Sequence, residues 1–417
     1  MKNLLNHFDH ALLMVIIGVC LTLLQMLGLY VIFEDDYTTS RAVINTMNIA
    51  APLMCFGFEI TAPQITKTEK NASFIWNFIS LHLFLLVTFV ICSFLAPDEK
   101  LKSIFLGLSL ASIFASKIIV VEFERTLGFV KQYFFNLHVR DRFYRTLAIL
   151  LIGYIFTTIY IWSALLIIFS LIYLFVITYK YKDDFLFNFK QFKNHIYICL
   201  PFFISAIAVV FIYRAVFYVS YFFDTNLITA KIDLWLIISL FILIPMMNIS
   251  KYAETQSKGN LSVYIKELQK GWKKITQQQF LIILMIFMLT VAGIYTDKVE
   301  KNDLILFIFP MMLSMLVVST IPSFFYLALL KGRIKISAYN IFTILLLSLT
   351  VYSLKFYYPA ISTAYLLLLN CILYTLFSLI MSKFFLGVNA MEIFRIKGFC
   401  QLFIFLIICF NLFILSF

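Results

Sequence analysis

The apolar residues of this chain come in runs of roughly 18–25, separated by short polar strips. A helix needs about 20 apolar residues to cross a hydrocarbon core about 30 Å thick. The runs do not show the alternation over about ten residues that is typical of the strands of a membrane barrel. Because lipid offers no partner to the backbone, each crossing segment must bond its own amides. The pattern therefore predicts an all-α polytopic membrane protein.

The runs predict thirteen helices, and the weaker boundaries allow a total of 12–14. The expected ranges are 11–33, 41–62, 73–96, 103–121, 146–160, 162–179, 196–222, 227–250, 279–296, 304–330, 338–355, 360–382 and 398–417. We interpret them as an N-terminal six-helix bundle (1–179), a basic cytoplasmic linker (180–195), a C-terminal six-helix bundle (196–382) and a C-terminal apolar segment (383–417). Two bundles with even helix numbers insert with the same orientation and enclose a central cavity, which is a transporter's plan.

The stretch 147–179 is apolar throughout, and only the region around Tyr160 suggests a turn between two helices. The distribution of Lys and Arg tests this hairpin, because cytoplasmic loops are enriched in these residues. With the hairpin, one set of alternate loops holds 24 of the 33 basic residues and the other set holds six. This bias favours the hairpin and a cytoplasmic N-terminus. The segment 251–278 is then a cytoplasmic loop, which we expect to form a basic amphipathic helix on the membrane surface.

Composition agrees with a membrane protein and excludes several other classes. The chain is 63% hydrophobic and 13% charged, whereas a soluble domain is about 25% charged. Its net charge of +12 comes from strips between apolar runs, so membrane topology explains it better than nucleic-acid binding. The seven cysteines lie inside apolar runs without metal-ligand spacing. There is no P-loop and no HExxH motif, so we expect neither an enzyme, a cofactor nor a metal site.

Ionisable residues inside the predicted helices are candidates for function, because charge is costly in the membrane. Arg214 lies about eight residues from the outer end of its helix, at a depth of about 12 Å. Lys231 and Asp233 enter the next helix from the same side. Either Arg214 and Asp233 form a structural pair, or this group is a cationic cavity wall that binds an anionic substrate. Arg41 opens the second helix at the outer boundary, either as an interfacial anchor or as a further substrate contact.

Three other residues are candidates for ion binding or gating. Glu59 and Lys117 are predicted within a turn of a cytoplasmic helix end, where a purely structural pair or a snorkelling side chain is the alternative. His82 lies near the middle of its helix, either as a proton carrier or as a hydrogen-bonded core residue.

Several short motifs resemble one family. They are Leu200-Pro201-Phe202-Phe203, Tyr213-Arg214, the polar turn Asp224-Thr225-Asn226 and the segment Phe123-Glu124-Arg125-Thr126-Leu127-Gly128. With the helix plan, they resemble the Wzx-type polysaccharide (O-antigen) flippases of the multidrug/oligosaccharidyl-lipid/polysaccharide (MOP) exporter superfamily. The thirteenth apolar run departs from the twelve or fourteen helices usual in that family, and it either crosses the membrane or caps the bundle.

The resemblance implies translocation of undecaprenyl-diphosphate-linked oligosaccharide units of O-antigen, capsule or a similar polysaccharide across the bacterial inner membrane. It also implies a cationic site containing Arg214, with Lys231, Arg41 and Asp233 as further contacts. The implied partners are the lipid-linked anionic oligosaccharide, membrane lipids, a polysaccharide polymerase and a chain-length regulator, and not nucleic acid. Two rivals remain open. A membrane glycosyltransferase or polysaccharide polymerase is disfavoured by the short outer loops, and a MATE-like drug or ion antiporter by the lack of acidic residues in the first helices.

Overall fold

The structure is a computed structural model that describes residues 2–56, 58, 73–126, 139–179, 181, 192–196, 203, 212–257, 260–296, 299–321, 324–331, 333–389 and 393–416. Helices and short connections make up these residues, and none of them forms a strand. The chain divides into two compact units, Met1–Ile207 and Ala208–Phe417. Eight of the described helices are long and apolar enough to cross a membrane. The predicted all-α membrane fold is confirmed.

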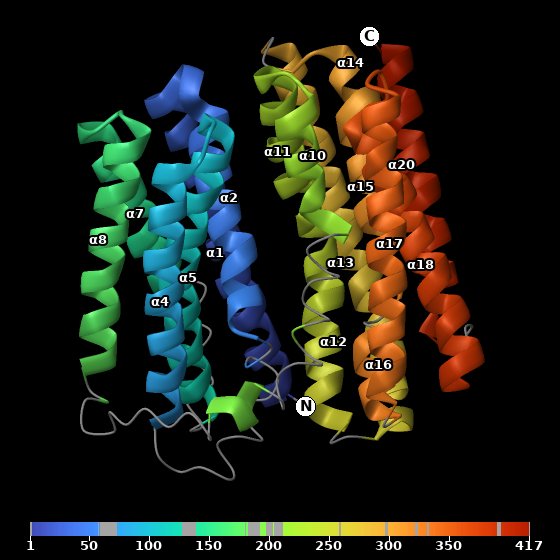
Figure 1. Cartoon of the computed structure of the whole chain (residues 1–417). Helices are drawn as coiled ribbons and strands as arrows, with labels where there is room; N and C mark the ends of the chain where they lie inside the picture. Colours follow the sequence, from blue (N-terminus) through green and yellow to red (C-terminus); the bar gives the residue numbers. More distant parts are fainter. Residues whose placement is uncertain are drawn as a thin grey trace. The chain divides into compact units, whose positions relative to one another are not determined.

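Six long helices make up most of the described part of the first unit (Figure 1). They are α1 (Lys2–Phe33), α2 (Tyr37–Met54), α4 (Ser73–Leu95), α5 (Glu99–Thr126), α7 (Asp141–Ile155) and α8 (Ile159–Thr178), with a short turn η1 (Glu34–Asp36) after α1. Helix α5 is the central one and packs against α2, α4 and α8. Its buried face carries small residues, and a Cβ at Gly107 would lie 2.6 Å from the carbonyl oxygen of Val43 in α2. Such small residues let two membrane helices approach closely.

The hairpin in the apolar stretch exists, although it turns a few residues before Tyr160. Helix α7 ends at Ile155 and α8 begins at Ile159. Phe156 and Thr158 are extended between them. Trp162, in the first turn of α8, is fully buried, and its indole N–H donates to the carbonyl of Ile149 in α7 at 3.0 Å. This bond fixes the two helices side by side, so the sequence-based hairpin is confirmed.

The described part of the second unit contains seven helical segments, and some of these segments consist of several consecutive short helices. They are α10 (Ala215–Phe223); α11 (Asn226–Leu240) with η4 (Phe241–Leu243) and α12 (Ile244–Ser257); α13 (Leu261–Tyr295); α14 (Lys301–Asp303) with η5 (Leu304–Ile308), α15 (Phe309–Val318) and α16 (Phe324–Leu330); α17 (Ile334–Tyr357); α18 (Thr363–Leu386); and α20 (Ile396–Ser416). The 3-10 turn η4 precedes Pro245, whose missing N–H prevents a regular helical bond at that point.

The segment 251–278 is not a surface-lying loop helix, so that prediction is wrong. Helix α12 continues to Ser257, and α13 begins at Leu261 as a single helix of 35 residues. Tyr264 and Leu268 are fully buried, and a Cβ at Gly271 would lie 2.6 Å from the side chain of Ile249 in α12. The apolar stripe of this segment therefore packs against the protein instead of lipid.

Helix α20 lies along α13 and α15 (Figure 1), so the C-terminal apolar run is part of the second unit and not a cap across its end. With 21 residues it is about 31 Å long, enough to cross a bilayer core. Just before it, the buried Arg395 donates to the side chains of Gln279 and Thr276 in α13. Gln279 in turn donates to the carbonyl of Ile242 in η4 at 2.7 Å. One buried chain of hydrogen bonds thus joins three elements.

Candidate functional site

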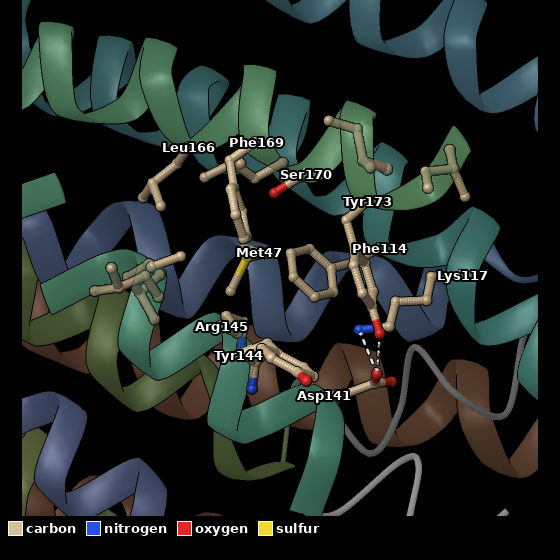
Figure 2. Close-up of a pocket in the computed structure, with 16 residues that line it drawn as sticks. Met47, Phe114, Lys117, Asp141, Tyr144, Arg145, Leu166, Phe169, Ser170 and Tyr173 are labelled. Carbon is tan, nitrogen blue, oxygen red and sulfur yellow. Dashed lines mark hydrogen bonds and ion pairs between the residues drawn. The ribbon is translucent and has the colours of Figure 1, made fainter. Parts of the chain in front are cut away.

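A small cavity in the first unit lies between α2, α5, α7 and α8 (Figure 2). Most of its wall is aliphatic or aromatic. Its polar lining consists of Lys117 from α5, Asp141, Tyr144 and Arg145 from α7, and Ser170 and Tyr173 from α8. The space open to the centre of a water molecule is about 30 Å³, so the cavity has room for water. The cavity combines low polarity with several buried charges.

Lys117 and Asp141 form a buried ion pair at one end of this cavity. The Lys117 ammonium lies 2.9 Å from Asp141 Oδ1, and the two side chains are 8% and 9% exposed. Tyr173 donates its hydroxyl to the same carboxylate oxygen at 3.0 Å, and its ring lies 4.6 Å from the ammonium. Helix α5 continues to Thr126, so Lys117 is more than two turns from its end and not within one turn as predicted.

Arg145 lines the same cavity and has a different set of partners. Its Nη1 donates to the side-chain oxygen of Asn48 in α2 at 2.9 Å, and its guanidinium lies 5.1 Å from the centre of the Phe114 ring. Its Nε is enclosed and has no hydrogen-bond acceptor among the described residues. Within the part of the chain that the structure describes, no carboxylate is paired with Arg145. Arg145 falls in a loop between the helices predicted at 103–121 and 146–160, whereas α7 begins four residues before it.

Two further arginines are held inside the first unit. Arg142 donates from Nη1 to the carbonyl of Gly18 at 2.9 Å and to the hydroxyl of Thr22 at 3.2 Å, both in α1. Arg41 is buried at 1% exposure, one turn inside α2, and its Nη2 donates to Asn45 at 3.1 Å. Its burial makes a simple interfacial anchor an insufficient explanation of Arg41.

The charges in the middle of the first unit are strongly unbalanced. Between the level of the Lys117–Asp141 pair and the outer turns, the described helices hold four cations and one acid. The cations are Arg41, Lys117, Arg142 and Arg145, and the acid is Asp141. Such an interior can attract an anion, because charged groups in a low-dielectric medium interact strongly.

The other candidate residues of the first unit are placed as follows. His82 is buried between α2 and α5, where its Nδ1 lies 2.9 Å from the hydroxyl of Ser116 and its Nε2 lies 2.9 Å from the carbonyl of Met54. It is therefore a hydrogen-bonded core residue in this structure. Glu59 lies outside the described residues. His82 does not line the cavity that contains Lys117.

Three candidates lie in the second unit. Lys231 in α11 contacts Glu300 and Asp303, each at 2.9 Å. This group carries one positive and two negative charges, so the structure favours a role for Lys231 in joining α11 to α14 over contact with an anion. Arg214 lies at a turn immediately before α10 and is partly buried, and Asp233 is buried in α11. The expected roles of Arg214 and Asp233 stay predictions.

The polar turn at residues 224–226 has a clear structural role. Thr225 caps α11 by accepting the backbone N–H of Ile228. The Asp224 carboxylate pairs with Lys355 of α17 at 2.7 Å and accepts the hydroxyl of Thr363 of α18 at 2.6 Å. This motif therefore fixes one end of the second unit. Among the described residues, no three His, Cys, Asp or Glu side chains gather as metal ligands would.

The fold is that of MATE transporters. The MATE multidrug transporter DinF-BH matches with a TM-score of 0.58 at 12% identity, over 91% of this chain and 95% of that chain. An outward-facing MATE family multidrug resistance transporter of the MOP superfamily matches with a TM-score of 0.53 at 13% identity, over 97% of this chain and 96% of that chain.

A third structure, a MOP superfamily transporter from Pyrococcus furiosus, matches with a TM-score of 0.55 at 12% identity, over 90% of this chain and 94% of that chain. It is described as having a binding pocket of reverse polarity that suggests a different function. No family model and no curated protein sequence matches this chain. The relationship is therefore one of fold.

Proposed function

We propose that this protein is a transporter of the MOP superfamily that moves undecaprenyl-diphosphate-linked oligosaccharide units from the cytoplasmic to the periplasmic leaflet of the bacterial inner membrane. The observation that carries this proposal is the excess of cations, four to one acid, in the described helices of the first unit between the Lys117–Asp141 pair and the outer turns; the buried acid Glu122 lies beyond this section, nearer the end of α5. A diphosphate bears about two negative charges, and a bare charge at the centre of a bilayer costs several kcal/mol. A basic, polar interior lowers this barrier, while the polyprenyl chain can stay in lipid.

Arg41 is the residue of this interior that we expect to contact the substrate. It is buried in α2 and shares one helical face with Asn45 and Asn48, at spacings of four and seven residues. Guanidinium groups bind phosphate through two parallel N–H donors, and amide side chains suit sugar hydroxyls. The face therefore offers donors for both parts of a lipid-linked sugar.

Export of cationic drugs is the second candidate, because the solved structures of this fold include multidrug transporters. Against it, the acid in the middle of the first unit, Asp141, is already paired with Lys117. A cationic substrate would meet net positive charge there. The reverse polarity reported for the Pyrococcus furiosus transporter supports the idea that this fold can carry a pocket of either sign.

The test is the pool of lipid-linked oligosaccharide in a strain that lacks the gene. We expect normal synthesis with accumulation on the cytoplasmic leaflet, where a periplasmic ligase or polymerase has no access. Units that lack a sugar would instead identify a glycosyltransferase. Loss of drug resistance with an unchanged lipid pool would identify a drug exporter.

A charge-removing variant refines the test. Arg41→Gln keeps a donor for Asn45 but removes the charge, so we expect translocation to fall at least tenfold while the protein still reaches the membrane. Lys273→Gln removes one charge from an exposed face of α13 and is the matched control. Full transport by Arg41→Gln would remove this residue from the mechanism.

A further inference from the structure

Two helical segments of the second unit are interrupted close to a proline. The first passes from α11 to α12 through η4, just before Pro245. The second passes from α15 to α16 after Val318, in a stretch whose sequence contains Pro322. Proline has no N–H, so the carbonyl four residues before it loses the donor of a regular helix. In a membrane, neighbouring elements must supply partners for backbone groups that are freed in this way.

Arg395 is connected to both interruptions by hydrogen bonds. Its guanidinium donates to the side-chain oxygens of Thr276 and Gln279 in α13. Gln279 in turn donates to the carbonyl of Ile242 in η4 at 2.7 Å. The backbone N–H of Arg395 donates to the carbonyl of Thr320, just after α15, at 3.1 Å. One residue therefore reaches the first interruption through Gln279 and the second interruption directly.

This group is enclosed by the protein. The exposed fractions of Arg395, Gln279 and Thr320 are 2%, 0% and 1%. A Cβ at Gly398 would lie 2.5 Å from the hydroxyl oxygen of Thr276, so glycine lets the start of α20 lie close to α13. The printed acceptors of the Arg395 guanidinium within the described part of the chain are neutral side chains. Its role there is to hold several N–H donors in a fixed planar arrangement.

We infer that Arg395 couples the two interruptions, so that α12 and α16 change their orientation together. An interruption in a helix is a place where one part can turn against the other. In Figure 1, α12 and α16 lie at the same end of the second unit, and η4 packs against α15. Anchoring α20 to α13 would need only the bonds to Thr276 and Gln279. The bonds to Ile242 and Thr320 add the coupling, which goes beyond the proposed function and does not depend on the substrate.

The experiment measures amide hydrogen exchange by mass spectrometry in the purified full-length protein in detergent. The segments 238–247 and 314–321 report on the two interruptions. We expect Arg395→Met to speed exchange about tenfold in both segments, because it leaves buried acceptors without donors and loosens the chain that carries the bond to Thr320. Lys397→Gln removes one charge at an exposed position two residues later and should leave both segments unchanged. Faster exchange in only one segment of Arg395→Met, or in neither, would overturn the inference.

A second variant covers the case in which Arg395→Met does not fold. Gln279→Glu keeps an acceptor for Arg395, but its carboxylate cannot donate to the carbonyl of Ile242. Exchange should therefore rise in segment 238–247 and keep its wild-type rate in segment 314–321. An unchanged rate in the first segment, or a raised rate in the second, would refute the connection through Arg395. These measurements use no lipid substrate, so their failure and the failure of the translocation test are separate results.

Discussion

Replacing Asp141 with asparagine should destabilise the protein more than replacing Lys117 with methionine, although both changes break the same pair. At 2.9 Å the attraction is about 6 kcal/mol for an effective dielectric constant of about 20. Desolvation offsets part of it, and loss of one partner of a buried pair costs about 3–5 kcal/mol. The asymmetry comes from the surrounding charge. Asp141→Asn leaves Lys117 among other cations, whereas Lys117→Met leaves Asp141 among cations that stabilise it.

The difference between the two variants can be estimated. A charge about 10 Å away contributes about 1.7 kcal/mol at the same dielectric constant. We therefore expect Asp141→Asn to cost at least about 1.5 kcal/mol more than Lys117→Met. The assay is reversible unfolding of the purified protein by denaturant in mixed micelles, followed by tryptophan fluorescence. The double variant Lys117→Met/Asp141→Leu is the control and should lie within about 2 kcal/mol of the wild type. Equal or greater destabilisation by Lys117→Met would refute the charge count.

Packing and topology each give one more test. Gly107→Ala adds a Cβ within 2.6 Å of the backbone of α2. We therefore expect a loss of about 1–3 kcal/mol of stability in the same unfolding assay, despite the better helix propensity of alanine. Unchanged stability would show that α2 and α5 can separate freely. A cysteine at Lys266 should resist a membrane-impermeant maleimide added from the periplasm, whereas one at Asn302 should react, because the basic end of α13 is expected in the cytoplasm. The reverse labelling pattern would invert the topology.

The sequence predicted the fold well because lipid imposes a strong and simple requirement on it. Long apolar runs identified most helices. The charge bias correctly indicated the break between α7 and α8, although the three residues of this break include neither glycine nor proline. The prediction that segment 251–278 lies on the membrane surface was wrong for a physical reason. An amphipathic stripe such as Tyr264 and Leu268 has the same pattern whether it faces lipid or a neighbouring helix, and here it faces α12.

The candidate site was harder to predict, because charge pairing depends on which helices become neighbours. Lys231 looked like a substrate cation, yet its partners Glu300 and Asp303 lie 69 and 72 residues away in the chain. Arg145 looked like a loop residue because the start of α7 is polar. One feature of the sequence could have identified this part of the site. Helical spacing places the ionisable Asp141 and Arg145 on the same helix face as the apolar core residues Ala148 and Ile149.

The buried link between Arg395 and Gln279 in the second unit has a consequence for how the protein is made. Burial lowers the pKa of the Arg395 guanidinium only to about 10, so the group stays charged in the cell. Arg395 and α20 leave the ribosome after the other described helices of their unit. Until then, Gln279 and the interrupted backbone at Ile242 lack part of their final network. Before α20 is made, the second unit therefore lacks the hydrogen bonds from Arg395 to α13.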